Sequence, residues 1–402
     1  MKLLRPSSTA VRVAMVLACT AAFADEPAGT PAAAPAPREF ILVNRTRDPV
    51  NKSYRRMLDG MALFEKMHAM APNASLRFKL LPRQRDTKRD GIVPEIIGDT
   101  VTVPVALAAD RTFTLVHDQE ALDENASVIP NRKASSMTWR AEIRTPGLPP
   151  NTRRLGDLRL ECRVGIESGL VSNTRPVIGL IADLIQGMLD FCDGSDVPYL
   201  FFSERPLFGV TMIAGARREI LSVDDLYAGI SHGRISKADL AYCDCQVLLD
   251  RTYFLPLGDK SWPDDTLIEF EYMDDGIGPR LAAAPSLATG SADTANTLAA
   301  RKAADAVAIG SSTEAELIAF LGKTTVVAFD SGYEVWVYQI IGDRVSGDTA
   351  ARASWVERIL HGSSEQETSR GKCEFVILFE PSRVVTKTRI RPAPAPGAAK
   401  VP

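Results

Sequence analysis

The chain has 402 residues, which is enough for two or three domains, and 45% of them are hydrophobic and 24% charged. This composition is that of a globular protein and excludes a fibrous or largely disordered chain. The formal net charge of −3 argues against a general nucleic-acid binder, which needs a basic surface.

The first 24 residues have the pattern of a secretory signal peptide. Lys2, Arg5 and Arg12 supply the positive charge that precedes the apolar run 13–24. This run is too short to span a bilayer, which takes roughly 20 residues. It ends in an A-x-A site, so we predict cleavage before Asp25 and export to the periplasm.

An outer-membrane lipoprotein is the alternative interpretation of the N-terminus. The segment Val16–Cys19 can act as a lipobox with Cys19 acylated, although Leu17 is a poor residue for the second position of that motif. An uncleaved anchor is a third alternative. No later segment is expected to cross a membrane, which predicts a mature body in an aqueous compartment.

Composition and local patterns divide the remaining chain into six predicted parts. They are an Ala/Pro-rich tether at 25–38, a β-rich domain with one amphipathic helix at 39–149, a cysteine-containing α+β domain at 150–275, a linker at 276–290, a C-terminal domain at 291–391 and a disordered tail at 392–402. The fold class expected from this order is α+β.

The β-rich domain begins with an amphipathic helix predicted over 51–71. Its apolar residues recur at steps of three and four: Tyr54, Met57, Leu58, Met61, Phe64 and Met67. A Met-rich face could dock a partner, but packing on the protein's own sheet is favoured. Alternation then predicts strands over 76–80, 101–105, 113–117 and 137–143. Their spacing indicates a small β-sandwich-like region.

The α+β domain is predicted to open with a strand over 154–162, which would place Leu158, Leu160 and Cys162 on one face. The stretch 176–191 is the most hydrophobic helix candidate of the chain. Further strands are predicted over 199–203, 208–214, 219–223 and 266–272.

Five cysteines remain after the predicted cleavage: Cys162, Cys192, Cys243, Cys245 and Cys373. In an exported chain, spaced cysteines favour disulfides over catalysis or metal binding. On a strand, the two sulfurs of a C-x-C pair share one face and suit bonds to other elements. We therefore expect Cys162 and Cys192 to bond to Cys243 and Cys245 in some order, with Cys373 left over.

The C-terminal domain has the most consistent local signals. An alanine-rich helix capped by Ser291 or Asp293 is predicted to end near Ala308, and Ser311 with Glu314 form a capping box for a second helix that ends at Gly322. The turn 330–332 predicts a hairpin between strands 325–329 and 333–340. A final strand is expected over 374–390, with an inserted helix in 342–372 that contains Trp355.

This order of elements resembles the BamE/SmpA outer-membrane assembly lipoprotein domain. The matching residues are Gly310, Glu316-Leu317, Leu321-Gly322, Tyr333, Trp336, Tyr338 and the stretch Phe375–Val385. The resemblance implies two helices on a three-stranded antiparallel sheet and a role in assembly or binding without catalysis. Lys323 stands where the family usually has proline, and the family's strong lipobox is missing.

Acidic residues form the best candidate for chemistry. The set comprises Asp264, Asp265, Glu269, Glu271, Asp274 and Asp275. Glu269 and Glu271 lie two apart on a predicted strand and could hold Ca²⁺ or act as a carboxylate pair, but a solvated sheet face is favoured. His232 is the one plausible general base, and a structural or surface histidine is the favoured interpretation.

Two other motifs carry weaker signals. The loop 82–91 contains four basic residues, Arg83, Arg85, Lys88 and Arg89. Because acidic residues are interspersed among them, a solvated turn is favoured over an anion site. Gly276-Ile277-Gly278 lacks the third glycine of a dinucleotide-binding loop.

These patterns favour a non-catalytic exported envelope protein, possessing no cofactor or metal, whose C-terminal domain binds an envelope protein. Trp336 and Tyr338 are candidate anchors, although positions in the sheet core are favoured for both. The alternative is a periplasmic enzyme, or a carbohydrate- or small-ligand-binding protein, that uses the domain at 150–275.

Overall fold

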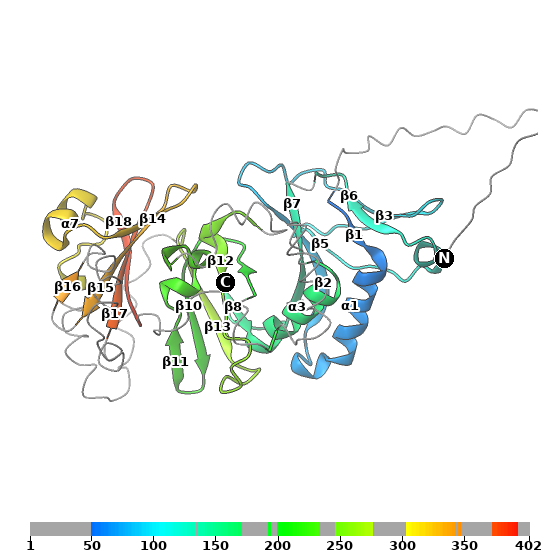
Figure 1. Cartoon of the computed structure of the whole chain (residues 1–402), viewed down its shortest axis with the longest axis horizontal. Helices are drawn as coiled ribbons and strands as arrows, with labels where there is room; N and C mark the ends of the chain where they lie inside the picture. The colour runs from blue at the N-terminus through cyan, green and yellow to red at the C-terminus, as the bar shows by residue number, and fades with distance from the viewer. Residues whose placement is uncertain are drawn as a thin grey trace, which may run out of the picture. The chain divides into compact units, whose positions relative to one another are not determined.

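The computed structural model describes residues 50–133, 136–170, 192–193, 199–232, 246–275, 303–341, 344–346 and 372–392, all of which belong to one compact unit, 45–402. The structure is α+β with several antiparallel sheets, as the sequence predicts (Figure 1). The predicted signal peptide, tether, helix 176–191, linker and tail lie outside the described residues, as does most of the inserted helix. Within the described ranges, no helix is long and apolar enough to cross a membrane.

The predicted amphipathic helix is confirmed as α1 (Tyr54–Lys66), which Ser53 caps by accepting a hydrogen bond from the Arg56 N–H. Its Met-rich face packs on the protein's own core, where Tyr54, Met57 and Phe64 are buried. The face that could have docked a partner is therefore occupied from within the chain.

Two antiparallel sheets share this first core. One has the order β5 (Thr112–Phe113), β2 (Ser75–Pro82), β7 (Met137–Arg144), and the other has the order β1 (Lys52–Ser53), β6 (Ser127–Pro130), β3 (Pro94–Ile97), β4 (Thr102–Pro104). The short helix α2 (Gln119–Asp123) precedes β6. The predicted strands 76–80 and 137–143 are thus confirmed as the long paired strands β2 and β7.

The strand predicted over 154–162 is wrong, because only β8 (Thr152–Arg154) is extended and α3 (Leu155–Glu167) follows at once. Both sides of α3 are buried: Leu155, Leu158 and Cys162 enter one core, and Leu160 and Val164 enter the other. A helix that is apolar on two sides imitates the alternation of a strand.

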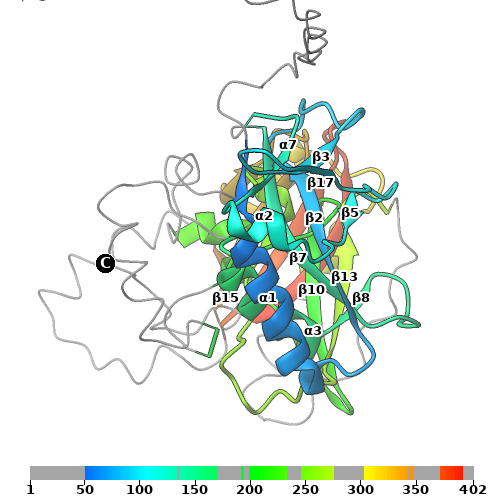
Figure 2. The same ribbon diagram turned by 90° about the vertical axis from the view of Figure 1, so that its right-hand side faces the viewer.

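Helices α1 and α3 run side by side (Figure 2). Gly60 of α1 allows this approach, because a Cβ there would lie 1.8 Å from Oγ of Ser168 and 3.2 Å from the carbonyl oxygen of Val164. A larger residue at position 60 would push the two helices apart.

The middle sheet has the order β11 (Arg217–Ile220), β10 (Leu207–Ala214), β13 (Leu267–Tyr272), β8, and β9 (Phe201–Phe202) pairs with β12 (Thr252–Tyr253). Short 3-10 turns occupy His68–Met70, Val223–Asp225, Tyr227–His232 and Leu249–Arg251. The strands predicted over 199–203, 208–214, 219–223 and 266–272 correspond to β9, β10, β11 and β13, with β11 beginning two residues earlier.

The predicted disulfide pairing is wrong. Cys162 bonds to Cys192, with their Cα atoms 6.1 Å apart, rather than to Cys243 or Cys245. The pairing was inferred from the C-x-C spacing of Cys243 and Cys245, which says nothing of how close Cys162 and Cys192 lie, and α3 places Cys162 within bonding distance of Cys192. Cys243 and Cys245 lie outside the described residues, and Cys373 is half-buried in the C-terminal sheet.

The C-terminal sheet has four strands on its main path rather than three. The order is β14 (Thr325–Ala328), β15 (Glu334–Ile341), β17 (Lys372–Phe379), β18 (Val385–Pro392), with the short β16 (Arg344–Ser346) also paired to β15. The single strand expected over 374–390 is a hairpin, because Pro381 cannot donate to a ladder and Arg383 turns the chain with a φ of 66°. The hairpin at 330–332 is confirmed.

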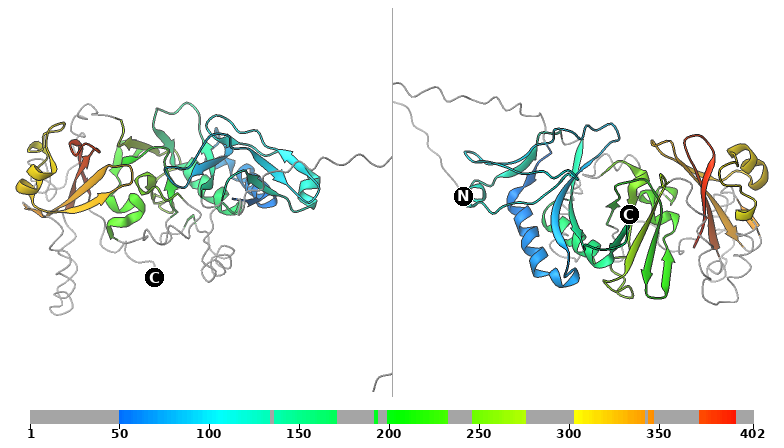
Figure 3. Two further views of the ribbon diagram at one scale, coloured as in Figure 1. Left: turned by 90° about the horizontal axis from the view of Figure 1, so that it is seen from above. Right: turned by 180° about the vertical axis from the view of Figure 1, so that it is seen from behind.

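Helix α7 (Glu314–Leu321) covers one face of this sheet and lies on its far side from the middle sheet (Figure 3). Thr313 caps it in a capping box with Glu316, two residues later than the predicted pair Ser311 and Glu314. Gly322 ends the helix with a φ of 83°. Of the other predicted helix, residues 303–308 are described; 303–305 are helical and 306–308 are not.

Candidate functional site

Five of the six acidic residues singled out from the sequence are ion-paired with arginines, and Asp265 forms no ion pair within the described residues. Glu269 and Glu271 share a face of β13, as predicted, where Glu269 pairs with Arg218 at 3.0 Å and Glu271 pairs with Arg389 of β18. Asp274 and Asp275 both pair with Arg205 at 2.6 Å, and Asp264 pairs with Arg159 at 2.6 Å. Within the described residues, no group of three or more His, Cys, Asp or Glu side chains could hold a metal ion.

His232 ends a 3-10 turn, and its side chain lies outside the description. Gly276–Gly278 and Trp355 also lie outside the described residues. The structure therefore leaves these candidates as sequence predictions.

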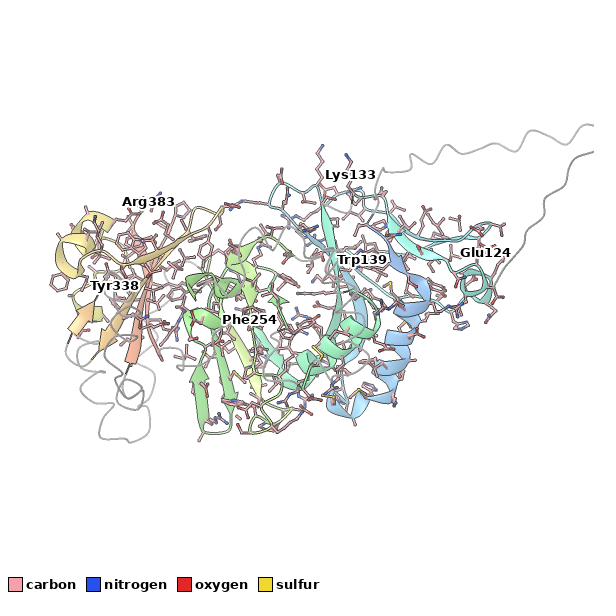
Figure 4. All side chains as sticks on the ribbon, viewed as in Figure 1. Glu124, Lys133, Trp139, Phe254, Tyr338 and Arg383 are labelled. Atoms are coloured by element: carbon pink, nitrogen blue, oxygen red, sulfur yellow. A yellow bond between two sulfur atoms is a disulfide. The ribbon has the colours of Figure 1, made fainter. Side chains whose placement is uncertain are left out.

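Trp336 and Tyr338 occupy the core of the C-terminal sheet, the position favoured from the sequence. Tyr338 is labelled on this sheet in Figure 4. The Tyr338 hydroxyl donates to the carbonyl oxygen of Gly322 at 3.0 Å, and Trp336 Nε1 donates to Glu334 at 3.2 Å. Neither ring is available as an exposed anchor.

A buried ionic layer, which sequence reasoning missed, lies on the face of β2 and β7 opposite their apolar core. We define it by Lys79, Arg140, Glu142, Arg153 and Glu161, whose side chains are all at most 6% exposed. Arg140 Nη2 lies 2.5 Å from Glu142, and Arg153 Nη2 lies 2.6 Å from Glu161 of α3. These charges lie between the two cores and join the β2–β7 sheet to the middle region.

Within the ionic layer, the neighbouring opposite charges stabilise the ionised form of Glu142. Burial opposes ionisation of Glu142, but Arg140, Arg153 and Arg144 together hold the pKa of that carboxyl well below its usual range. Burial raises the pKa of Tyr199 and of Tyr253, so both hydroxyls stay protonated at neutral pH. This arrangement suits a structural network better than a group that exchanges protons.

A second polar contact attaches the C-terminal sheet to the middle sheet. Three basic side chains alternate along β18. Lys387 donates to the Tyr272 carbonyl oxygen, Arg389 donates to the Glu271 carboxylate, and Arg391 donates to the Phe208 carbonyl oxygen. The fully buried Glu374 of β17 accepts a hydrogen bond from Val223 N–H at 3.1 Å, and burial raises its pKa. One face of the C-terminal sheet is therefore committed to intramolecular packing.

The C-terminal domain also carries exposed apolar side chains. Six large apolar side chains are exposed in the part of the chain that the structure describes, and four of them are in this domain: Ile309, Ile318, Phe320 and Val326. Phe320 of α7 is 64% exposed and Val326 of β14 is 46% exposed. Val326 pairs with Trp336 and so lies on the side of the sheet that α7 covers. We call Ile318, Phe320 and Val326 the α7–β14 surface.

A cavity of about 370 Å³, which we call the junction pocket, lies between the loop after β2, the segment 247–251 and the tip of the β14–β15 hairpin. Arg85, Arg89 and Arg251 line it together with Asp250, Asp274 and Asp330. Arg85 Nη1 donates to the backbone oxygen of Asp330 at 3.2 Å, which joins the loop to the hairpin tip.

Comparisons of the chain with family models, curated proteins and solved structures found no match. The resemblance to the BamE/SmpA domain accordingly rests on the sequence motif alone, and arguments about function depend on the geometry described above.

Proposed function

We propose that the chain is a non-catalytic exported envelope protein whose C-terminal domain binds another envelope protein through the α7–β14 surface. The observation that carries the proposal is the exposure of Ile318, Phe320 and Val326 on a domain in which Phe329, Trp336, Tyr338, Phe375 and Phe379 are buried. The sequence resemblance to BamE/SmpA and the predicted signal peptide supply the compartment.

The occupant that suits this surface is an extended apolar segment of the partner, which adds to β14 as a further strand. Among the described strands, β14 lies at the edge of its sheet, and its residues Val326-Val327-Ala328 include neither a charge nor a proline. Soluble proteins usually protect sheet edges with such residues, so an uncharged edge is a template for strand addition. Phe320 of α7, which is 64% exposed, supplies the apolar contact for a side chain of the added strand.

The enzymatic alternative draws little support from the carboxylates that suggested it. Arg218 pairs with Glu269, and Arg389 pairs with Glu271, so both acids are neutralised within the fold. A general base or nucleophile needs a carboxylate that is free to meet a substrate. The small-ligand alternative is taken up separately below.

Site-specific photocrosslinking in the protein's own envelope tests the proposal. A benzoylphenylalanine placed at position 320 or 326 should give an adduct with a partner, and mass spectrometry should map the crosslink to an apolar, extended segment. Position 116 is the matched control, because Val116 is 61% exposed on a different part of the chain. The control position should give no such adduct.

Three outcomes would overturn the proposal. They are the absence of adducts at both 320 and 326, equal labelling at 116, and an adduct that contains a second copy of this chain in place of a different protein. Substitution Val326→Pro should remove the adduct at 320, because proline at the edge prevents strand addition while the residue itself stays largely in solvent.

A further inference from the structure

The junction pocket has the size and the walls of a small-molecule site. Its volume of about 370 Å³ lies within the range of ligand pockets, roughly 300–1,000 Å³. Pro206, Leu249, Phe329 and Tyr333 contribute apolar surface to the lining. The walls come from five parts of the chain that are far apart in the sequence (82–89, Pro206, 247–251, Asp274 and 328–333), so the pocket exists only in the folded chain.

Three guanidinium groups converge on this pocket. Arg85 and Arg89 come from the loop 82–91, and Arg251 is the last residue of the 3-10 turn Leu249–Arg251. Arg251 Nη1 donates to the backbone oxygen of Glu204 at 2.5 Å, which fixes the side chain. Its Nε is buried without a hydrogen-bond partner, and within the described ranges none of the three arginines forms an ion pair with a carboxylate.

Three acidic residues also line the pocket, and Asp330 among them accepts a hydrogen bond from Arg85 through its backbone oxygen. Asp274 is held by Arg205 at 2.6 Å. Asp250 is buried, and this burial raises the pKa of its carboxyl. Burial also lowers the pKa of Arg251. The negative charge of Asp250 raises this pKa, and the positive charge of Arg89 lowers it. A bound anion would relieve the repulsion among the three arginines.

We propose that the junction pocket binds a small organic anion, whose carboxylate or phosphate group lies among Arg85, Arg89 and Arg251 and whose apolar body lies against Leu249 and Phe329. Guanidinium groups match carboxylates and phosphates with two parallel hydrogen bonds, and such charge-assisted bonds are the strong ones. From the sequence, the loop 82–91 alone favours a solvated turn; Arg251 and the pocket walls change that balance. This site is separate from the α7–β14 surface and does not depend on it.

Isothermal titration calorimetry on the whole mature chain tests the proposal with three probes: benzoate, phenyl phosphate and inorganic phosphate. Benzoate or phenyl phosphate should bind saturably, and inorganic phosphate should bind more weakly because it has no apolar body. Whichever organic anion binds more tightly identifies the preferred head group as carboxylate or phosphate.

Arg85→Gln and Arg89→Gln should each weaken binding about tenfold or more, which is about 1.4 kcal/mol. Both side chains are exposed, so the fold should survive, and circular dichroism checks this. Arg218→Gln, which removes an equal charge from the exposed strand β11, should change the affinity less than twofold. The proposal is overturned if neither organic anion binds, if inorganic phosphate binds as tightly as phenyl phosphate, or if all three variants behave alike.

Discussion

Replacing Glu142 by glutamine tests whether the buried ionic layer holds the β2–β7 sheet to the middle region. Glu142 lies 2.5 Å from Arg140 Nη2, 2.5 Å from Arg144 Nε and 3.9 Å from Lys79 Nζ, and its side chain is 6% exposed. Glu142→Gln keeps the size of the side chain and removes the negative charge, so the change is electrostatic rather than steric.

The expected loss is about 3 kcal/mol of unfolding free energy at pH 7. Removing one partner of a buried ion pair costs roughly 3–5 kcal/mol, because the remaining charge is left buried and uncompensated. Arg140 is 5% exposed, but it keeps its hydrogen bond to the Phe202 carbonyl oxygen and lies 3.8 Å from the half-exposed Glu204. These two contacts place the cost near the lower end of the range.

The effect should depend on pH in a defined direction. The folded pKa of Glu142 is held below the unfolded value, which is about 4.3. The stabilisation is therefore present above the unfolded pKa and is lost as the pH falls through the folded one. The difference between wild type and Glu142→Gln should be constant from about pH 7 to pH 5 and should shrink toward about pH 3.

Urea unfolding followed by far-ultraviolet circular dichroism measures this difference. Glu269→Gln is the control, because Glu269 and Arg218 form a pair with both side chains about half exposed, and its loss should be within about 0.5 kcal/mol. A wild-type-like midpoint for Glu142→Gln at pH 7, or a loss of equal size at pH 3, would refute the reasoning.

Three further outcomes are expected. Changing both Cys162 and Cys192 to alanine should cost about 3–4 kcal/mol by the loop-closure entropy of a 30-residue separation, measured by urea unfolding against the oxidised wild type. Trp336→Ala should cost roughly 3–5 kcal/mol, whereas Phe320→Ser should cost less than about 1 kcal/mol, and equal losses would contradict the assignment of core and surface. Glu374→Gln should leave the free energy of unfolding at pH 7 unchanged or raise it. The folded pKa of Glu374 is raised, so the ionised carboxylate destabilises the fold above the unfolded pKa, and this cost disappears as the pH falls.

Local patterns predicted the elements that bury one face. Helix α1, strands β2, β7 and β13 and the β14–β15 hairpin all have a single apolar periodicity, and each was found where that periodicity indicated. The pattern failed at α3, where residues on two sides are buried in different cores. The turn at Pro381 carried a readable signal, because a proline within a run of strand residues marks a break.

Polar alternation could not reveal the ionic layer. Lys79, Arg140 and Glu142 alternate with apolar residues, which is the pattern of a strand with one face in water. Whether that face meets solvent or another part of the chain depends on Glu161, Phe202 and Glu204, which lie far along the sequence. The same reason explains why the loop 82–91 did not reveal the junction pocket: Arg251 and Phe329 belong to distant segments.

The aromatic motif of the C-terminal domain shows how packing redistributes the roles suggested by a sequence. Tyr333, Trp336 and Tyr338 occur together on one strand, and the sequence suggested the last two as binding anchors. Trp336 and Tyr338 are buried under α7, whereas Tyr333 is half-buried and lines the junction pocket. Because the middle sheet covers one face of this domain and α7 covers the other, a partner can reach it through the outside of α7 and the edge of β14. Phe320 and Val326, which are absent from the motif, are therefore the residues on which the proposed interaction depends.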